Sequence, residues 1–222
     1  MTSTLSTLWS PPWLASCALA VCLLPGCAVT ASPDPRREMI ATLGAAAPHP
    51  SMGGESAIFD RLVGTWDSRF SFRAADGTVS YSRGEVRFGW IIDGRALQDI
   101  WIGYPRDSTR ERSIGTSVRF FDTATRIWRV VFIAPAFGLL LELTGGAQGD
   151  RIVLRGTDRA GLSLRWSFND IQADSFVWRG ETSSDGGRTW HLAEEHQMRR
   201  RKGRDARDRL PLDARPLREI PR

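Results

Sequence analysis

Cysteine is absent from most of this 222-residue sequence, because none follows Cys27. The other two cysteines, Cys17 and Cys22, lie in the same N-terminal stretch. A domain formed by the later residues therefore contains no disulfide and no cysteine-ligated metal site. Such a domain must be held together by its apolar core.

The N-terminal stretch also lacks an apolar run long enough to cross a bilayer as a helix. The run from Leu14 to Leu24 has 11 residues, a length typical of the core of a secretory signal. It ends in Leu24-Pro25-Gly26-Cys27, which resembles the lipobox of bacterial lipoproteins. The resemblance implies a signal peptide over residues 1–27, lipidation of Cys27, and anchoring to the membrane on the periplasmic side of the cell envelope.

Two alternatives for localisation stay open, because no Lys or Arg precedes Arg36 where signal peptides usually carry a basic residue. The small residues 28–31 also suit ordinary signal cleavage, which would give a secreted protein. Translation from Met39 or Met52 would instead give a cytoplasmic protein without a signal.

An excess of basic charge is absent from the globular part of the sequence. The net charge is +5, but residues 199–222 alone carry ten basic and four acidic side chains, which leaves −1 for residues 1–198. We expect residues 201–222 to be a disordered, solvated tail. Nucleic acid is not an expected partner, since a folded nucleic-acid-binding module carries its basic charge on its own face.

The segment between the signal and the domain is rich in Ala, Pro and Gly, and residues 28–55 are predicted to be a linker. The domain is predicted to span residues 56–200 and to open with one short helix over Ser56–Val63. Ile58, Phe59 and Leu62 share one face of that helix, and Gly64 suits its C-terminal cap.

After this helix the sequence has no helical period, and short aromatic and β-branched segments alternate with turn residues. The predicted strands are Trp66–Arg73, Val79–Ile91, Ala96–Gly103, Gly115–Asp122, Trp128–Ile133, Leu139–Thr144, Arg151–Gly156, Leu162–Asn169, Ser175–Glu181 and Trp190–Arg199. Hairpin connections predict an all-β fold, an antiparallel up-and-down β-barrel of about ten strands, because a closed barrel leaves no edge strand. A two-sheet sandwich is the alternative.

Val63-Gly64-Thr65-Trp66, a short helix followed by Gly-x-Trp at the first strand, resembles the opening of lipocalins and related calycin barrels. The resemblance implies that Trp66 closes one end of the barrel against a basic residue near the last strand, either Arg199 or Arg200.

Other stretches resemble an uncharacterised bacterial family of lipocalin-like barrel domains, which implies the fold and no activity. These stretches are Leu62–Trp66, Phe88–Trp90 with Gly94–Asp99, Val118–Asp122 with Trp128, and Arg165–Phe168.

Residues 183–190 match the Asp-box of sialidase-type propellers, Ser-x-Asp-x-Gly-x-Thr-Trp. A propeller would need several copies at a regular spacing, and this sequence has one. The motif therefore predicts a hairpin turn, in which Asp185 accepts backbone N–H groups and Gly187 adopts a positive φ.

His191-Leu192-Ala193-Glu194-Glu195-His196 resembles the inverted zincin motif but has one residue too many, so no metal site is predicted. If Trp190, Leu192 and Met198 face the apolar side of the last strand, Glu194 and His196 point into the barrel and His191 points to solvent.

Two further carboxylates are candidates for the barrel interior. Asp99 alternates with Leu97 and Trp101, and Glu142 interrupts the apolar run from Leu139 to Leu143. A shift of one residue in register would reverse either assignment.

The sequence contains no Ser-His-Asp signature and no Gly-rich phosphate loop, so our leading hypothesis is a non-catalytic barrel. It would bind a small apolar molecule through Trp101, Trp166, Trp178, Glu194 and His196. No cofactor is expected, although His196 could ligate haem iron. The alternatives are a structural or interaction protein of the envelope, and an enzyme that uses Glu194, His196 and Asp99 as acid–base groups.

Overall fold

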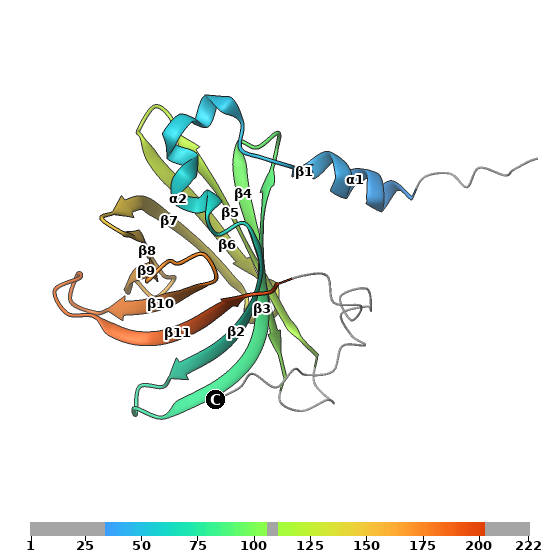
Figure 1. The fold of residues 1–222 in the computed structure, drawn as a ribbon. Coiled ribbons are helices and arrows are strands. Elements are labelled where there is room, and N and C mark those ends of the chain that lie inside the picture. The colour runs from blue at the N-terminus through green and yellow to red at the C-terminus, as the bar shows by residue number, and fades with distance from the viewer. Residues whose placement is uncertain (1–33, 106–110, 203–222) are drawn as a thin grey trace, which may run out of the picture. The chain divides into compact units, whose positions relative to one another are not determined.

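The computed structural model describes residues 34–105 and 111–202, and Figure 1 shows their arrangement. Cys27, the expected lipidation site, lies outside the described residues, as does the expected tail from residue 203 onward. Within the two described ranges, no helix is both long enough and apolar enough to cross a membrane. The helical elements are α1 (Pro35–Leu43), the 3₁₀ helix η1 (Pro50–Ser56), α2 (Ala57–Asp60) and the 3₁₀ helix η2 (Pro135–Phe137).

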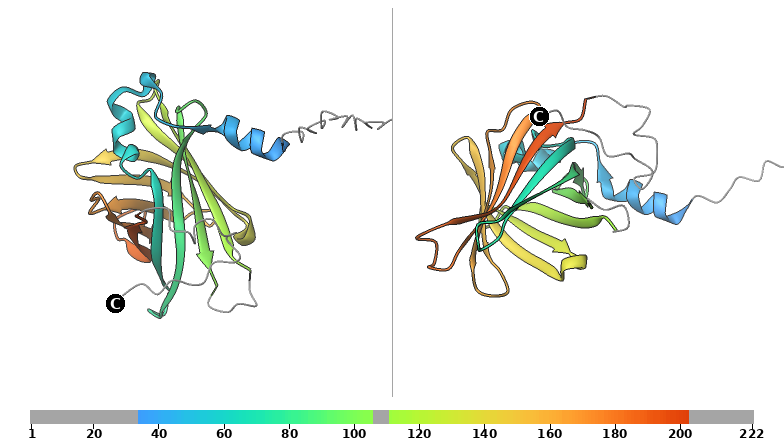
Figure 2. Two further views of the ribbon diagram at one scale, coloured as in Figure 1. Left: turned by 45° about the vertical axis from the view of Figure 1, so that its right-hand side comes forward. Right: turned by 90° about the horizontal axis from the view of Figure 1, so that it is seen from below.

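The strands form one antiparallel sheet that closes on itself. They are β1 (Gly44–Ala45), β2 (Gly64–Arg73), β3 (Val79–Ile91), β4 (Ala96–Tyr104), β5 (Ser113–Asp122), β6 (Ile127–Ala134), β7 (Leu139–Gln148), β8 (Arg151–Thr157), β9 (Ser163–Asn169), β10 (Ser175–Ser183) and β11 (His191–Arg200). From β2 to β11 each strand pairs with the next in sequence, and β11 returns to pair with β2. Figure 2 shows these strands wrapped around a common interior. The predicted up-and-down barrel is confirmed, and the sandwich alternative is wrong.

Alternating side chains form the interior of the barrel. On β9, Leu164 and Phe168 are buried and Trp166 packs against the same core, as the alternation of this strand predicts. The other members of the core cluster include Trp66, Val86, Phe88, Trp90, Leu97, Trp128, Val130, Leu143, Ile152, Leu154, Phe176 and Met198.

The segment expected to be a linker differs from that expectation in its described part. It contains α1, β1 and η1, and β1 extends the sheet by pairing Gly44 with Ile91 of β3. Met52 of η1 is buried in the core. The packed fold therefore begins before Ser56. The helix predicted over Ser56–Val63 is also shorter than expected, since only α2 is α-helical.

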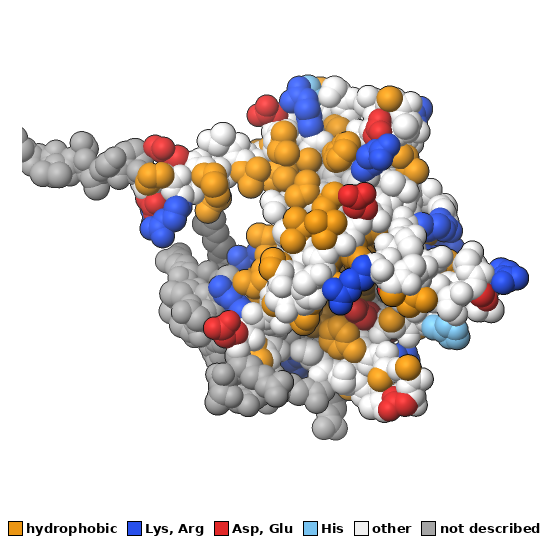
Figure 3. All heavy atoms as spheres, turned by 180° about the vertical axis from the view of Figure 1, so that it is seen from behind, with side chains coloured by type: hydrophobic (Ala, Val, Ile, Leu, Met, Phe, Trp, Pro, Cys, Tyr) orange, Lys and Arg blue, Asp and Glu red, His pale blue; other side chains and the backbone are white. Residues whose placement is uncertain are grey.

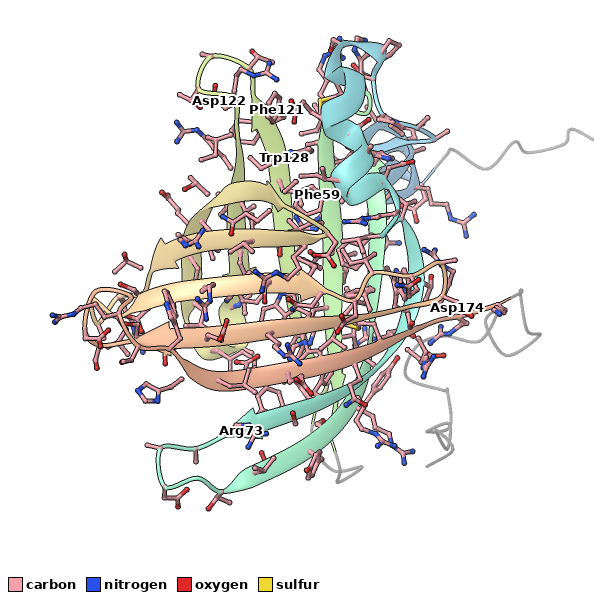
Figure 4. The ribbon with its side chains drawn as sticks, turned by 60° about the vertical axis from the view of Figure 1, so that its left-hand side comes forward. Phe59, Arg73, Phe121, Asp122, Trp128 and Asp174 are labelled. Carbon is pink, nitrogen blue, oxygen red and sulfur yellow. The ribbon has the colours of Figure 1, made fainter. Side chains whose placement is uncertain are left out.

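The short helix α2 covers one end of the barrel, which we call the closed end. Phe59 of α2 is fully buried and makes an edge-to-face contact with Trp128 of β6, with ring centroids 4.7 Å apart. Trp128 in turn packs against Phe121 of β5. Figure 4 shows these three side chains close together beside α2. Burial of several aromatic rings at one point fixes α2 against the strands.

Trp66, at the start of β2, lies where the first and last strands of the barrel pair, opposite Arg200 of β11. Its indole Nε1 donates to the carbonyl of Leu62, 2.7 Å away, and the guanidinium of Arg200 lies over its ring at 4.1 Å. Of the two arginines considered for this position, Arg200 occupies it. Nη1 of Arg200 also donates to the carbonyl of Val63 and would lie 2.6 Å from a side chain added at Gly64. Glycine is favoured there by its φ of +129°, and a side chain at this position would also displace the guanidinium of Arg200.

Asp185 organises the turn between β10 and β11. Its carboxylate accepts hydrogen bonds from the backbone N–H groups of Arg188 and Thr189 and from the Thr189 hydroxyl, and Gly187 has a φ of +88°. The hydrogen bonds from Thr189 hold the pKa of this carboxyl well below its usual range. These hydrogen bonds to Asp185 hold the backbone of the turn in place, as the motif predicts.

On the outside of the barrel, the side chain of Arg201 joins β2 and β3. It donates to Asp67 and, over 2.7 Å, to the fully buried carboxylate of Glu85, which also accepts from Arg87 at 2.9 Å. Residue 201, which we assigned to the tail, therefore belongs to the packed fold. Burial alone would raise the pKa of Glu85, but hydrogen bonding to Arg201 and the positive charges of Arg87 and Arg201 hold that pKa below its usual value.

A pH-dependent contribution to stability follows from Glu85. A lowered pKa in the folded state stabilises the protein above the ordinary carboxyl pKa of 4.5, and this stabilisation is lost as the pH falls through the folded-state pKa. Glu85→Gln is expected to lower the free energy of unfolding at neutral pH by roughly 1.5–3 kcal/mol. The same variant should lose less stability than the unaltered protein on acidification, as measured by urea unfolding at two pH values.

Glu142→Gln is the matched control, because Glu142 lies exposed on β7. It should change the free energy of unfolding by less than about 0.5 kcal/mol. Equal acid sensitivity of the Glu85→Gln variant and the unaltered protein would show that Glu85 does not titrate as described.

Candidate functional site

The barrel interior contains a cavity of about 990 Å³. It is lined mostly by apolar and aromatic side chains, among them Phe70, Val86, Trp101, Phe132, Leu141, Leu164, Trp166 and Trp178. Tyr81 and Phe137 also line it, and both are more than half exposed, so the cavity reaches the surface at the end opposite α2. We call that end the mouth. Two acidic residues, Glu111 and Asp158, line the cavity at the mouth.

Aromatic side chains form a belt around the middle of the cavity. Trp166 of β9 makes edge-to-face contacts with Phe132 of β6 and Trp178 of β10, each with a centroid separation of 5.3 Å. On the other side, Trp101 of β4 packs against Phe70 of β2 at 5.3 Å. All three tryptophans that the sequence analysis named as ligand-binding residues therefore line the cavity. We use the term aromatic belt for the five side chains of Phe70, Trp101, Phe132, Trp166 and Trp178.

His196 of β11 lies in the cavity wall beside the aromatic belt. Its ring lies 4.5 Å from both Phe70 and Trp178 by centroid separation, and its side chain is only 7% exposed. An oxygen of Glu194 lies 3.3 Å from its Nε2, but this nitrogen makes no aligned hydrogen bond in the described structure. The contact counts as an ion pair only if His196 is protonated.

Glu194 and His196 thus lie together in the cavity wall, while Asp99 binds a different partner. Asp99 of β4 also lines the cavity, but its carboxylate pairs with Arg119. An acid–base role for Glu194, His196 and Asp99 stays a prediction. Haem ligation by His196 remains a prediction. Among residues 34–105 and 111–202, no group of three or more His, Cys, Asp or Glu side chains could hold a metal ion.

One predicted face of β11 is wrong, and a β-bulge explains why. His196 and Glu194 follow the expected alternation, and His191 is exposed as expected. The register with β10 then shifts between Gly180 and Glu181, so that Glu194 pairs with Gly180 but Leu192 pairs with Glu181. The bulge reverses the alternation. Leu192 therefore does not share the inward face of His196. A separate correction concerns β7, where Glu142, a candidate for the interior, is exposed to solvent.

Arg119 of β5 is the functional candidate that the sequence analysis missed. It is 1% exposed, lines the cavity near the closed end, and donates through Nη2 to Asp99. Its guanidinium carbon lies 5.1 Å from the ring centroid of Phe59 and 5.4 Å from that of Phe88. Cation–π contact with these rings stabilises the buried charge in part. Arg119 shares the inward face of β5 with Gly115 and Ser117, and this polar face gave no sequence signal for an interior position.

Several polar atoms around this cavity are buried without a hydrogen-bond partner in the described structure. They include Nε and Nη1 of Arg119, Nε1 of Trp101 and Nε2 of His196. A buried donor without an acceptor costs free energy, and folded proteins satisfy most such groups. All three side chains line the cavity, where water or a bound molecule can supply the missing hydrogen-bond partners.

Comparison with known proteins supports the fold alone. No family model matches the chain, and no curated protein matches it either. Among solved structures, Rv2717c from M. tuberculosis is 16% identical with a TM-score of 0.51, over 70% of this chain and 99% of that one. The S-type phycobiliprotein lyase CPES from Guillardia theta is 13% identical with a TM-score of 0.49, over 67% of this chain and 93% of that one. The likeness to Rv2717c shows that the two chains share a barrel fold.

Proposed function

We propose that this protein is a non-catalytic binding barrel that holds a small, largely apolar molecule. The observation that carries the proposal is the cavity of about 990 Å³ inside the barrel. Barrels of similar strand number either fill their interior with side chains or leave room for one ligand. An interior filled by side chains would have contradicted ligand binding, but the interior of this barrel contains a cavity instead.

The size and lining of the cavity both favour an apolar ligand. Binding pockets for small molecules measure about 300–1,000 Å³ and combine apolar walls with a few polar groups that fix orientation. Here the aromatic belt supplies the apolar walls, and Arg119, Asp99, Glu194 and His196 supply the polar groups. This division of roles suits recognition of one orientation of a mostly hydrocarbon molecule.

The proposal includes export and a lipid anchor, and its support is the lipobox-like sequence ending at Cys27. An anchored binding barrel would present its ligand at the membrane on the periplasmic side. Labelling of the expressed full chain with a radioactive fatty acid tests the anchor, and Cys27→Ser should abolish the label. Label retained in that variant would contradict the assignment of Cys27.

A second candidate, an interaction protein of the envelope, is favoured by apolar residues on the outer surface. Ile133 of β6 lies in register with Leu140 of β7 on one side and with Thr116 of β5 on the other, and Leu140 is 64% exposed. Ile100 of β4 continues the row beyond Thr116. Figure 3, seen from the side opposite to Figure 1, shows hydrophobic side chains gathered near the middle of the face. The sharpest form of this candidate is a dimer through that row, which Ile133→Glu should convert to a monomer.

Extraction of the purified full chain tests the main proposal. Organic extraction followed by mass spectrometry should recover one apolar compound in roughly equimolar amount, which an unrelated protein purified in parallel lacks. An extract that contains no such compound, together with no binding of apolar fluorescent probes, would overturn the proposal.

A substitution pair on β7 tests whether ligands occupy the cavity itself. Leu141 lines the cavity, and Leu140, its neighbour in sequence, points to solvent. Leu141→Trp fills part of the cavity and is expected to weaken binding of an apolar fluorescent probe at least tenfold, whereas Leu140→Trp should leave the affinity unchanged. Equal effects of the two substitutions in a fluorescence titration would place the probe outside the barrel.

A further inference from the structure

The inner end of the cavity carries a built polar group. Arg119 of β5 and Asp99 of β4 pair there, and their side chains are only 2% and 9% exposed. Phe59 of α2 closes the barrel beside them, 5.1 Å from the guanidinium carbon. The pair is therefore far from the mouth and enclosed by protein on the side of the closed end.

The hydrogen bonds of this pair are incomplete. Nη2 of Arg119 donates to Asp99, but Nε and Nη1 are buried and donate to nothing in the described structure. The rings of Phe59, Phe88 and Phe168 lie 5.1–5.9 Å from the guanidinium and attract its charge. Ring faces are weak acceptors, so they do not replace the oxygen partners that guanidinium N–H groups normally find.

We propose that the inner end of the cavity is a head-group site, where Nε and Nη1 of Arg119 donate to an uncharged carbonyl oxygen of the bound molecule. The ligand class is an apolar chain or ring system that ends in an amide, ester or ketone. This inference rests on the proposed binding function and adds the chemistry of the ligand and its direction in the barrel. The carbonyl lies at the inner end, and the apolar body lies along the aromatic belt toward the mouth.

The charge state of the pair decides against charged head groups. Asp99 already neutralises Arg119, so a carboxylate placed beside the guanidinium would lose its hydration and also face the negative charge of Asp99. An ammonium group would face the positive charge of Arg119 in the same way. An uncharged carbonyl supplies the missing acceptor without adding a charge to a buried site, which makes it the favoured partner.

A matched series of ligands tests the inference. The full chain is titrated calorimetrically with dodecanamide, dodecanoate and dodecylamine, whose chains have the same carbon count, at a pH where the two ionisable compounds are charged. Dodecanamide is expected to bind about tenfold tighter than either charged compound. Arg119→Met should remove this advantage. Asp99→Asn leaves the guanidinium without its compensating anion and should shift the preference toward dodecanoate.

Arg129→Met is the control, because Arg129 forms an ion pair with Asp122 on the outside of β6 and is about half exposed. It should leave all three affinities unchanged. Equal affinities for the three compounds in the unaltered protein would overturn the head-group site and leave the proposed binding function standing. Binding of none of them would also overturn the head-group site, and the extraction experiment then decides the proposed binding function. The comparison in the unaltered protein needs no variant, so it decides the question even if Arg119→Met does not fold.

Discussion

Asp99→Ala is expected to lower the free energy of unfolding by about 3–5 kcal/mol, because it leaves the guanidinium of Arg119 buried without its anion. The double variant Asp99→Leu with Arg119→Met should lose much less, since a buried ion pair can often be replaced by apolar side chains at little cost. Guanidinium chloride unfolding of Asp99→Leu, of Arg119→Met and of the double variant gives the coupling energy between the two residues.

The cycle distinguishes an ion pair from simple packing. If Asp99 and Arg119 only fill space, the two single losses add, and the double variant is the least stable protein of the set. If the pair is coupled as its geometry indicates, the double variant is more stable than Asp99→Ala. Additive losses would therefore contradict the assignment of a coupled buried pair at the inner end of the cavity.

Trp66→Ala is expected to cost about 3–5 kcal/mol of unfolding free energy, the range for removing a large aromatic side chain from a core. Trp66 is fully buried, packs edge-to-face on Phe176 at 4.7 Å, and is covered by Arg200. Its loss opens a cavity where the first and last strands of the barrel meet. Thermal unfolding followed by near-ultraviolet circular dichroism measures the change.

Trp190→Ala is the matched control, because an arginine also stacks on that ring. The guanidinium of Arg165 lies 4.2 Å from the ring centroid of Trp190, but this tryptophan lies partly exposed at the β10–β11 turn. The control should cost no more than about 1.5 kcal/mol, since an exposed cation–π contact contributes about 0.5–1 kcal/mol. Equal losses at Trp66 and Trp190 would show that burial at the closed end is not what stabilises the protein.

The strands were predictable from sequence because short aromatic and β-branched segments are separated by strong turn residues, and some of these segments alternate cleanly. Leu164, Trp166 and Phe168 alternate with polar neighbours, and only one face of that strand can be buried. The closed end was predictable from Trp66 and its Gly-x-Trp context, although the choice between Arg199 and Arg200 needed the structure. The start of the fold was not predictable, because β1 adds only two residues to the edge of β3.

The polar end of the cavity could not be predicted, because β5 has apolar residues on its outer face. Val118 and Phe120 flank Arg119 in sequence, and an ordinary strand would bury those two and expose the arginine. The barrel does the opposite, and Phe120 is 43% exposed. For β11, the bulge near Gly180 defeats any rule of strict alternation. The single extra residue of such a bulge has no characteristic sequence pattern by which it could be predicted.

The pairing of β11 with β2 has a consequence for how the chain folds. From β2 to β11 every other strand pair joins neighbours in sequence, but this one pairs Met198 with Ser68 and Arg200 with Trp66. Hairpins can therefore assemble in order as the chain is made, whereas ring closure must wait for residues near 200. Until then β2 and the newest strand are both unpaired edges, open to aggregation. We expect closure to be the slow folding step, and a chain truncated before β11 to depend on a chaperone for solubility.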